Sequence, residues 1–489
     1  MNHQEERPAD WVLMVYMGAT SVLDSFAVES LKQMKRAAGD GIIVAAQFDA
    51  SGHDEIRRLV FDGTGDKGAS IENDVKDSFF PDNDKKPAKF LEEFILWAYD
   101  RPECKAAAHY CLILWTDGSL APAGLPTSKE SQEVIDNSRR QNFLLPVELR
   151  KALEQVRNPE GSPEQHPKRR KFEIIGMDAC NMSMIEDVYE LRECADFLIA
   201  SEEEIPDASW PYEQLLPLFR EHKDKTLEIC RSVAREYGRA YQDYISNEST
   251  GLKKVTLSCL QLAHISKVIE PLKELAQALL AAVKRDKNTR HAVFSARKKA
   301  KSFVAGLFAD AFGFCHQLPH ELTAGNIVNK ELESACIKVC NAISTPYAEG
   351  PSVGKNRTFG PQPQIVVGNE TSQPDLCHGL LIYFPYSTAA EKEAFDQFNA
   401  IAKGGTDILN KSRAVAIAQI ENYYVKLELT KPTRWLEFIR VGWSRCLIQE
   451  EPLQLDIRYS GQQCAIQLES YLSQLEQDCQ DCKVKSAVA

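Results

Sequence analysis

Residues 172–180 are Phe-Glu-Ile-Ile-Gly-Met-Asp-Ala-Cys, a short apolar run with strand character that delivers an acidic residue and then a cysteine at its end. In open α/β sheets the strand ends carry the chemistry, because side chains there face a crevice while the backbone behind them is rigid. Cys180 is therefore a candidate nucleophile. The alternative is a buried structural cysteine, which is the commoner role of a lone cysteine after a strand.

The sequence after Cys180 predicts a helix. Apolar residues recur at helical spacing over residues 181–191. We therefore expect Cys180 to lie just before a helix, whose N-terminal dipole favours a thiolate.

Strand-like and helix-like segments alternate through the first part of the chain, which predicts an α/β fold with a mostly parallel sheet and helices on both faces. This order places Asp117 and Cys180 at the ends of neighbouring strands, and two long polar segments between them would rim the site. These segments are residues 121–141 and 157–170. The expected strands are residues 12–17, 42–48, 110–115, 172–177 and 197–201, and the expected helices are residues 22–37, 87–98 and 146–156.

Helical periodicity dominates from residue 223 onwards. It predicts an α-rich subdomain over residues 223–441 that packs on the sheet and returns a strand or two to it. Residues 442–489 form a small C-terminal extension for which the sequence suggests no role. The expected helices are residues 227–245, 265–283 and 289–303, and the expected strands are residues 255–262 and 380–384.

Several segments resemble the clostripain family of cysteine peptidases, whose members share the caspase-like fold. The most specific are Asp178-Ala179-Cys180, the helix that ends at residues 189–191, and residues 200–206 followed by Trp-Pro-Tyr at 210–212. Further resemblances follow in order at residues 11–17, 47–49, 57–58, 309–314 and 379–385. The resemblance covers roughly residues 10–440. It implies a caspase-like core at residues 10–222, completed by the α-rich subdomain, and cleavage after Arg or Lys through the cysteine.

One position departs from the family pattern. A family strand ends in Trp-x-His-Gly, whose histidine is the general base, whereas residues 115–118 here are Trp-Thr-Asp-Gly, so Asp117 takes the histidine position. A histidine with a pKa of about 6.5 can pair with the thiolate and protonate the leaving amine, and an aspartate with a pKa of about 4 does neither well. We therefore expect a loss of several orders of magnitude in rate unless another group compensates. Gly118 is kept. The resemblance assigns its N–H to the developing oxyanion, and the alternative is a simple turn glycine.

None of the ten histidines of the chain lies in a Trp-x-His-Gly context. His109 begins the strand that ends at Asp117, which puts it roughly 25 Å away if that strand is straight. His378 precedes an expected strand and fits a partly exposed loop histidine. His166 lies in a polar loop, and only a fold-back of that loop could bring it to the site.

The resemblance also implies an acidic pocket for a basic substrate side chain. Asp178 resembles the family's pocket acid, and a bidentate Arg–carboxylate contact gives specificity. Glu202, Glu203 and Asp207 are further candidates for the pocket wall, and the alternative is a solvated acidic loop. If the pocket is kept while the base is lost, the chain would be an inactive pseudopeptidase that binds a basic segment of a partner or serves as a scaffold.

The composition excludes some classes of function. The net charge of −12 and the pI near 5.5 argue against a nucleic acid as the main partner, because phosphate binding requires a basic face. The basic residues 168–171 are either a processing or docking site or a solvated loop. The chain has no run of roughly 18 apolar residues that would predict a membrane span.

The cysteines and the N-terminal residues predict a cytoplasmic protein. The 14 cysteines are scattered without the spacing of a disulfide framework, and the polar residues 1–10 lack the apolar core of a signal peptide. Cys479 and Cys482 form a lone Cys-x-x-Cys pair, which does not predict a metal site without further ligands. The sequence leaves cofactors, divalent-metal dependence and oligomeric state open.

Overall fold

The computed structural model describes twelve ranges of the chain, which include Cys180 and the core of the protein. These ranges are residues 9–19, 23–50, 55–82, 85–116, 125–126, 143–158, 171–242, 254–303, 307–343, 364–373, 375–385 and 427–439. The predicted extension at residues 442–489 and most of the two predicted polar loops lie outside them.

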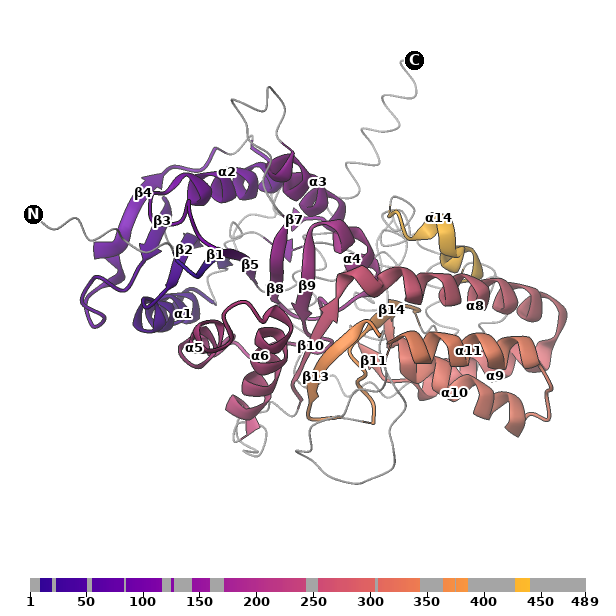
Figure 1. Ribbon diagram of the computed structural model, residues 1–489. Helices are drawn as coiled ribbons and strands as arrows, with labels where there is room; N and C mark the ends of the chain where they lie inside the picture. The colour runs from indigo at the N-terminus through magenta and orange to yellow at the C-terminus, as the bar shows by residue number, and fades with distance from the viewer. Residues whose placement is uncertain are drawn as a thin grey trace, which may run out of the picture.

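A nine-stranded sheet forms the centre of the molecule, with the strand order β13-β10-β9-β8-β5-β1-β2-β3-β4 (Figure 1). Its strands are β1 (Trp11–Ala19), β2 (Ile42–Ala50), β3 (Ile56–Phe61), β4 (Val75–Phe79), β5 (His109–Thr116), β8 (Phe172–Asp178), β9 (Ala195–Ala200), β10 (Thr256–Gln261) and β13 (Val366–Thr371). The five strands from β9 to β2 are parallel, and the two outer strands on each side are antiparallel. The predicted α/β fold class is therefore confirmed.

Helices cover both faces of this sheet and divide its side chains into two cores. Trp11, Leu13 and Val15 pack on one face with α1, α5 and α6, whereas Val12 and Met14 pack on the other with α2, α3, α4 and α8. This alternation follows from the period of two residues in a strand. The helices are α1 (Asp24–Ala37), α2 (Pro87–Asp100), α3 (Pro146–Arg157), α4 (Ile185–Glu190), α5 (Tyr212–His222), α6 (Thr226–Ala240) and α8 (Ile265–Arg285).

A group of four helices lies beyond the β13 side of the sheet, where α8 packs on α11 and α9, and α10 packs on α9 and α11 (Figure 1). The remaining helices of this part are α9 (Lys287–Lys299), α10 (Ala311–Ala324), α11 (Lys330–Ile343) and the short α14 (Thr430–Thr433). The predicted helix over residues 289–303 was too long, because residues 302–303 form a strand instead. That strand, β11 (Ser302–Phe303), pairs with β12 (Phe308–Asp310), which pairs with β14 (Leu381–Tyr383).

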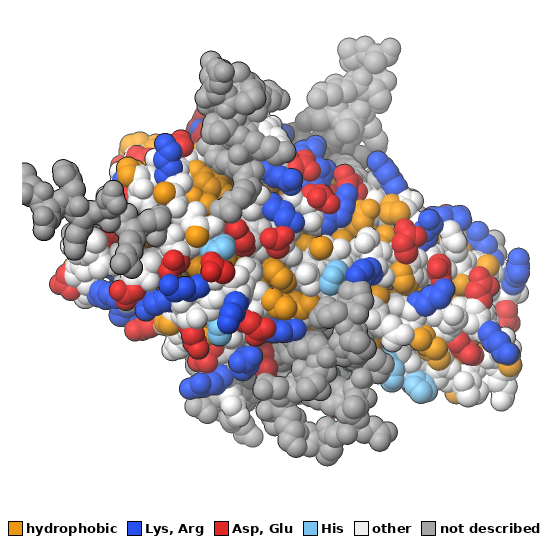
Figure 2. All heavy atoms as spheres, in the orientation of Figure 1, with side chains coloured by type: hydrophobic (Ala, Val, Ile, Leu, Met, Phe, Trp, Pro, Cys, Tyr) orange, Lys and Arg blue, Asp and Glu red, His pale blue; other side chains and the backbone are white. Residues whose placement is uncertain are grey.

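Short elements complete the described part of the chain. They are the hairpin of β6 (Leu125–Pro126) and β7 (Phe143–Leu144) and the single turns η1 (Ile71–Asp74), η2 (Leu191–Glu193) and η4 (Leu262–His264). Within the described ranges, no helix is long and apolar enough to cross a membrane. Acidic and basic side chains are interspersed over the face drawn in Figure 2.

Candidate active site

Cys180 lies two residues after the end of β8, at the carboxyl edge of the parallel strands. β8 and β5 are parallel neighbours, and Asp178 pairs in register with Trp115. The predicted neighbourhood of these two strands is therefore confirmed as far as Thr116, the last described residue of β5. Asp117 and Gly118, the predicted base position and oxyanion donor, lie outside the described residues.

Residues 180–183, the cysteine loop, turn the chain out of the sheet. Asn181 has a φ of +57°, a left-handed conformation that asparagine tolerates better than most residues. Cys180 is partly exposed, and the backbone N–H of Ile205 donates to its Sγ at 3.2 Å. The Sγ also lies 3.9 Å from Ile205 O, to which a protonated thiol can donate, so the backbone of Ile205 offers contacts to both the thiolate and the thiol.

The helix after the cysteine begins later than the sequence predicted. α4 starts at Ile185 and has Met184 as its N-cap residue. The cysteine loop separates Cys180 from this helix end. The helix dipole acts within about one turn, so the later start of α4 weakens its effect on Cys180. The N–H group that donates to the sulfur belongs to Ile205, which lies outside α4.

Two segments distant in sequence hold the cysteine loop in place. From one side, Asn181 N donates to Glu203 O at 3.1 Å, and Ser183 N donates to Ser201 O at 3.1 Å. From the other side, Ser183 Oγ donates to Gly379 O at 2.7 Å. The candidate nucleophile, Cys180, is thus positioned by the turn after β9 and by the chain before β14.

Asp178 is buried directly behind the cysteine loop and is asymmetrically hydrogen-bonded. Its Oδ2 accepts from Ser209 Oγ, from Tyr212 OH at 2.6 Å and from Trp210 N at 3.3 Å. Its Oδ1 is buried and has no hydrogen-bond partner in the described chain. Burial raises the pKa of Asp178 to about 6, although the three hydrogen bonds oppose that shift. The carboxylate is thus ionised at neutral pH and has one acceptor to spare.

A glycine allows the segment that binds Asp178 to approach β8. A Cβ atom added to Gly176 would lie 2.9 Å from the indole of Trp210, which is closer than packed side chains come. The close fit places Ser209 and Tyr212 over the end of β8. Neither residue was predicted to have a role, although residues 210–212 were among the segments that carry the resemblance.

The three further candidates for the acidic pocket wall differ in position. Glu202 is fully buried, and its Oε2 accepts from Gly379 N at 2.8 Å. Glu203 forms an ion pair with Lys301 at 3.0 Å and is mostly buried. Asp207 is exposed. The predicted contact of these three residues with a substrate stays a prediction.

Both histidines that the sequence placed near the expected strands have carboxylate partners. His109 stands at the start of β5, as predicted, and its Nε2 lies 2.8 Å from Asp224 Oδ1. His378 Nδ1 lies 2.9 Å from Asp310 Oδ1, and its ring stacks on Phe312 with centroids 4.2 Å apart. His378 is therefore held as the structural loop histidine that the sequence predicted, and His166 lies outside the described residues.

The described part of the chain contains no group of three or more His, Cys, Asp or Glu side chains arranged to hold a metal ion. Cys336 and Cys340, which the sequence placed on one face of a helix, are both buried on α11.

Comparison with known proteins identifies the family. The family model of the clostripain family matches residues 15–440. A solved structure of a secreted C11 cysteine protease from Bacteroides thetaiotaomicron, in complex with an irreversible peptide inhibitor, is 16% identical and covers 87% of this chain and 99% of its own, with a TM-score of 0.53. An inactive zymogen C11 protease from Parabacteroides distasonis is also 16% identical over 87% of this chain and 99% of its own, with a TM-score of 0.48. No curated protein matches the sequence.

Proposed function

Because the chain belongs to the clostripain family of cysteine peptidases, we propose that it is an endopeptidase that uses Cys180 as its nucleophile and cleaves after Arg or Lys. We further propose that Asp117, at the position of the family histidine, makes the chain a poor catalyst. The substrate is then a protein or peptide with an accessible basic residue.

The unpartnered oxygen of Asp178 is the observation that carries the proposed specificity. A buried carboxylate oxygen without a donor is costly, and a guanidinium or ammonium group would supply the missing N–H and a compensating charge. The other oxygen is fixed by Ser209 and Tyr212, so the orientation of the carboxyl group is set before a substrate binds. The exposed Asp207 adds negative charge to the segment that includes Ile205, the residue whose N–H donates to Cys180.

The proposed reaction is an acyl transfer. The sulfur of Cys180 attacks the peptide carbonyl carbon, the carbon–nitrogen bond breaks, and the amine leaves after it has gained a proton. Water then attacks the thioester, which releases the acid and restores the thiol. By the family resemblance, the backbone N–H of Gly118 stabilises the oxyanion in both steps. Both steps also need a group that carries a proton between nucleophile and leaving group.

Asp117 is poorly suited to carry that proton. A carboxylate with an ordinary pKa of about 4 is a weak base toward a thiol and is not protonated when the amine leaves. Its negative charge beside Cys180 would also oppose formation of the thiolate. These effects support the second candidate function, in which the chain is a pseudopeptidase that holds a basic peptide without cleaving it.

Hydrolysis of fluorogenic Arg and Lys peptides by purified variants separates the two functions. The proteins are the natural chain, Cys180→Ala, Asp117→His and Asp178→Asn in the Asp117→His background. A peptide with citrulline in place of arginine is the matched substrate, because citrulline has nearly the same shape and no charge. The same peptides, labelled and made uncleavable, report binding.

We expect Asp117→His to cleave the Arg peptide much faster than the natural chain, and both to prefer it to the citrulline peptide. Loss of that preference in the Asp178→Asn variant would identify the acid that selects the substrate. If the natural chain binds the Arg peptide tightly and only Asp117→His cleaves it, the result favours the second function, a pseudopeptidase that binds a basic peptide. A natural chain as fast as Asp117→His would refute the proposed impairment, and cleavage by Cys180→Ala would refute the nucleophile.

A further inference from the structure

A buried pair of carboxyl groups lies behind the cysteine loop, outside the catalytic groups named above. Glu202 follows β9 and Asp310 ends β12, and both are fully buried. Glu202 Oε2 accepts from Gly379 N, and Asp310 Oδ2 accepts from N of the preceding residue, His378, so the two carboxyl groups flank the same stretch of backbone and each shifts the pKa of the other. Two ionised carboxylates so placed would repel each other strongly in a buried site, so the pair must hold a proton.

The hydrogen bonds around the pair show which carboxyl carries the proton. Asp310 accepts from two backbone N–H groups, Gly313 N and His378 N, and its Oδ1 lies 2.9 Å from His378 Nδ1, which donates to it when that nitrogen carries a proton. Glu202 accepts from one, Gly379 N, and its Oε1 has no N–H or O–H donor in the described chain. Because N–H donors stabilise the ionised form, the charge belongs on Asp310 and the proton on Glu202 Oε1, which then donates to Asp310.

The direction of the two pKa shifts agrees with this count. Burial raises the pKa of Glu202 well above its ordinary range, and the neighbouring Asp310 raises it further. Burial also acts to raise the pKa of Asp310, but the charge and hydrogen bonds of His378 outweigh it and leave that pKa below its ordinary value. The two groups therefore titrate as one unit with a single negative charge.

Other charged groups next to the pair do not change the single negative charge that Glu202 and Asp310 share. Glu203 is neutralised by its ion pair with Lys301, which also lies beside Lys254. Burial, followed by the charges of the neighbouring carboxylates, raises the pKa of the Cys377 thiol and keeps it protonated. His316 lies on the outer side of His378, and burial lowers its pKa.

The pair joins the two segments that hold the cysteine loop. Asn181 Nδ2 donates to Glu202 O at 2.5 Å, and the carboxyl of Glu202 accepts from Gly379 N. Gly379 O in turn accepts from Ser183 Oγ. Three residues after Glu202, the N–H of Ile205 reaches the cysteine sulfur. A change at the carboxyl pair is thus two hydrogen bonds away from the loop that presents the nucleophile.

We propose that Glu202 and Asp310 share one proton, carried by Glu202, and that this carboxyl pair positions Cys180 by fixing the turn after β9 against the chain before β14. Glu202 and Asp310 are positioning residues and do not contact the substrate. The inference rests on the proposed function only in taking Cys180 as the nucleophile. Its test measures alkylation and not hydrolysis, so the two proposals can fail separately.

Three substitutions in the full-length chain test the pair. Glu202→Gln is the conservative variant, because its amide can donate to Asp310 as the protonated carboxyl does and can still accept from Gly379 N. Glu202→Met has similar size but neither the donor nor the acceptor. Asp310→Asn removes the charge and turns an amide N–H₂ toward one of its present donors. For each, we would measure the unfolding midpoint and the iodoacetamide alkylation rate of Cys180 against pH, by mass spectrometry of its peptide.

We expect Glu202→Gln to match the natural chain in both measurements. Glu202→Met and Asp310→Asn should unfold at lower temperature and alkylate Cys180 about tenfold more slowly near neutral pH, with the alkylation profile moved to higher pH, because the turn no longer holds the N–H of Ile205 at the sulfur. A Glu202→Gln variant that unfolds early, or an Asp310→Asn variant that behaves like the natural chain, would place the proton on Asp310 and overturn the assignment.

A Glu202→Met profile unchanged in pH, with only a lower unfolding midpoint, would reduce the pair to a purely structural element and refute the positioning role. If Glu202→Met and Asp310→Asn do not fold, Glu202→Gln alone still decides the assignment of the proton. It must then fold, unfold and alkylate as the natural chain does.

Discussion

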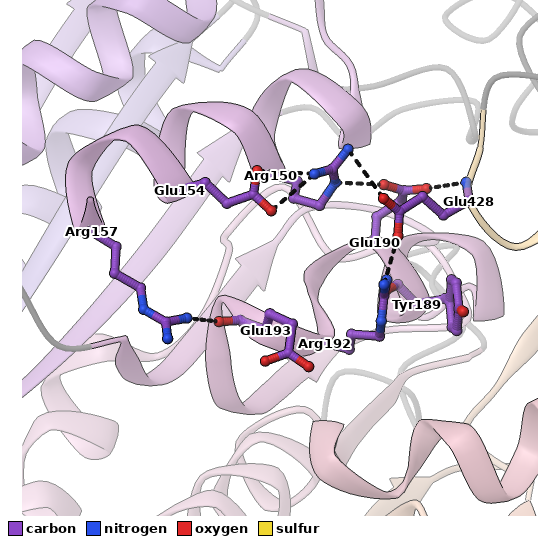
Figure 3. A network of polar contacts seen from close by, with 8 residues as sticks. All are labelled: Arg150, Glu154, Arg157, Tyr189, Glu190, Arg192, Glu193 and Glu428. Atoms are coloured by element: carbon purple, nitrogen blue, oxygen red, sulfur yellow. Dashed lines mark hydrogen bonds and ion pairs between the residues drawn. The ribbon is translucent and has the colours of Figure 1, made fainter. Parts of the chain in front are cut away.

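Arg150 on α3 is a residue whose removal should cost much stability, because it pairs with a buried carboxylate. Its Nε donates to Glu190 Oε2 at 2.9 Å, and its Nη1 donates to Glu154 Oε1 at 2.9 Å (Figure 3). The side chain of Glu190 has no solvent exposure, whereas that of Arg150 is 16% exposed. The backbone N–H of Glu428 also donates to Glu190. The pair therefore joins α3, α4 and the segment at residues 427–439.

The expected cost of Arg150→Met follows from the burial of Glu190. Breaking a buried ion pair by removing one partner costs about 3–5 kcal/mol, because the remaining charge stays buried. The N–H of Glu428 still donates to Glu190 in this variant, and Arg150 is slightly exposed. We therefore expect Arg150→Met to lower the free energy of unfolding by about 3 kcal/mol, the lower end of that range. The exposed contact with Glu154 adds only about 0.3–0.5 kcal/mol. Together these would lower the thermal midpoint by on the order of 5 °C.

The same helix offers a matched control. Arg157 makes one hydrogen bond in Figure 3, from Nη1 to Glu193 O at 2.7 Å, in an exposed position. Arg157→Met is the same arginine-to-methionine replacement, but it leaves no buried charge without a partner. It should lower the free energy of unfolding by about 0.5 kcal/mol or less. Thermal unfolding monitored by fluorescence and by circular dichroism would compare the two variants.

A third variant tests the cause of the loss. Glu190→Gln in the Arg150→Met background removes the stranded charge, so it should recover part of the lost stability, and the double-mutant cycle gives the coupling of the pair. Equal midpoints for Arg150→Met and Arg157→Met would refute the argument from burial. A double variant no more stable than Arg150→Met would show that lost packing, and not the buried charge, caused the effect.

Three further predictions follow from single contacts. Gly176→Ala would place a methyl group against the indole of Trp210 and should lower stability by about 1–3 kcal/mol in thermal unfolding, and an unchanged midpoint would contradict the close fit. Because the pKa of Asp178 is raised to about 6, its carboxylate loses its charge as the pH falls through that value. In the Asp117→His variant, the ratio of kcat/KM for the Arg peptide to that for the citrulline peptide should therefore drop below about pH 6. A ratio that stays flat from pH 5 to 8 would exclude Asp178 as the group that selects the substrate. Trp435→Phe removes the buried N–H donated to Tyr383 O at 2.7 Å and should cost about 2 kcal/mol, with an effect under about 0.5 kcal/mol counting against that bond.

The central strands could be predicted from the sequence because each is an apolar run buried on both faces. β5 and β8 were found to within one residue at each end for this reason. β4 was missed, since it lies at the sheet edge and carries polar side chains, as in Val-Lys-Asp-Ser-Phe over residues 75–79. β3 was also missed, although it is mostly buried between β2 and β4, because two arginines interrupt its apolar run.

The partners of the site residues could not be predicted, because they come from distant parts of the chain. The family resemblance implied a role for Asp178, two residues before the cysteine, but its donors lie more than 30 residues later. Glu202 was a further candidate for the pocket wall, and its neighbours Gly379 and Asp310 are each more than 100 residues away. A run of acidic residues does not reveal which of them turns inward.

The loss of the base and the support of the nucleophile are separable in this fold. The bonds that hold the cysteine loop come from the turn after β9 and the chain before β14, and those that hold Asp178 come from residues 209–212. None of these bonds involves the side chain at residue 117, which follows the end of β5. Under the proposed function, aspartate in place of the family histidine removes a proton carrier and leaves the groups proposed to orient the thiol and to bind a basic side chain. Asp117→His alone should therefore raise turnover, and the size of that gain measures how much of the catalytic arrangement the natural chain retains.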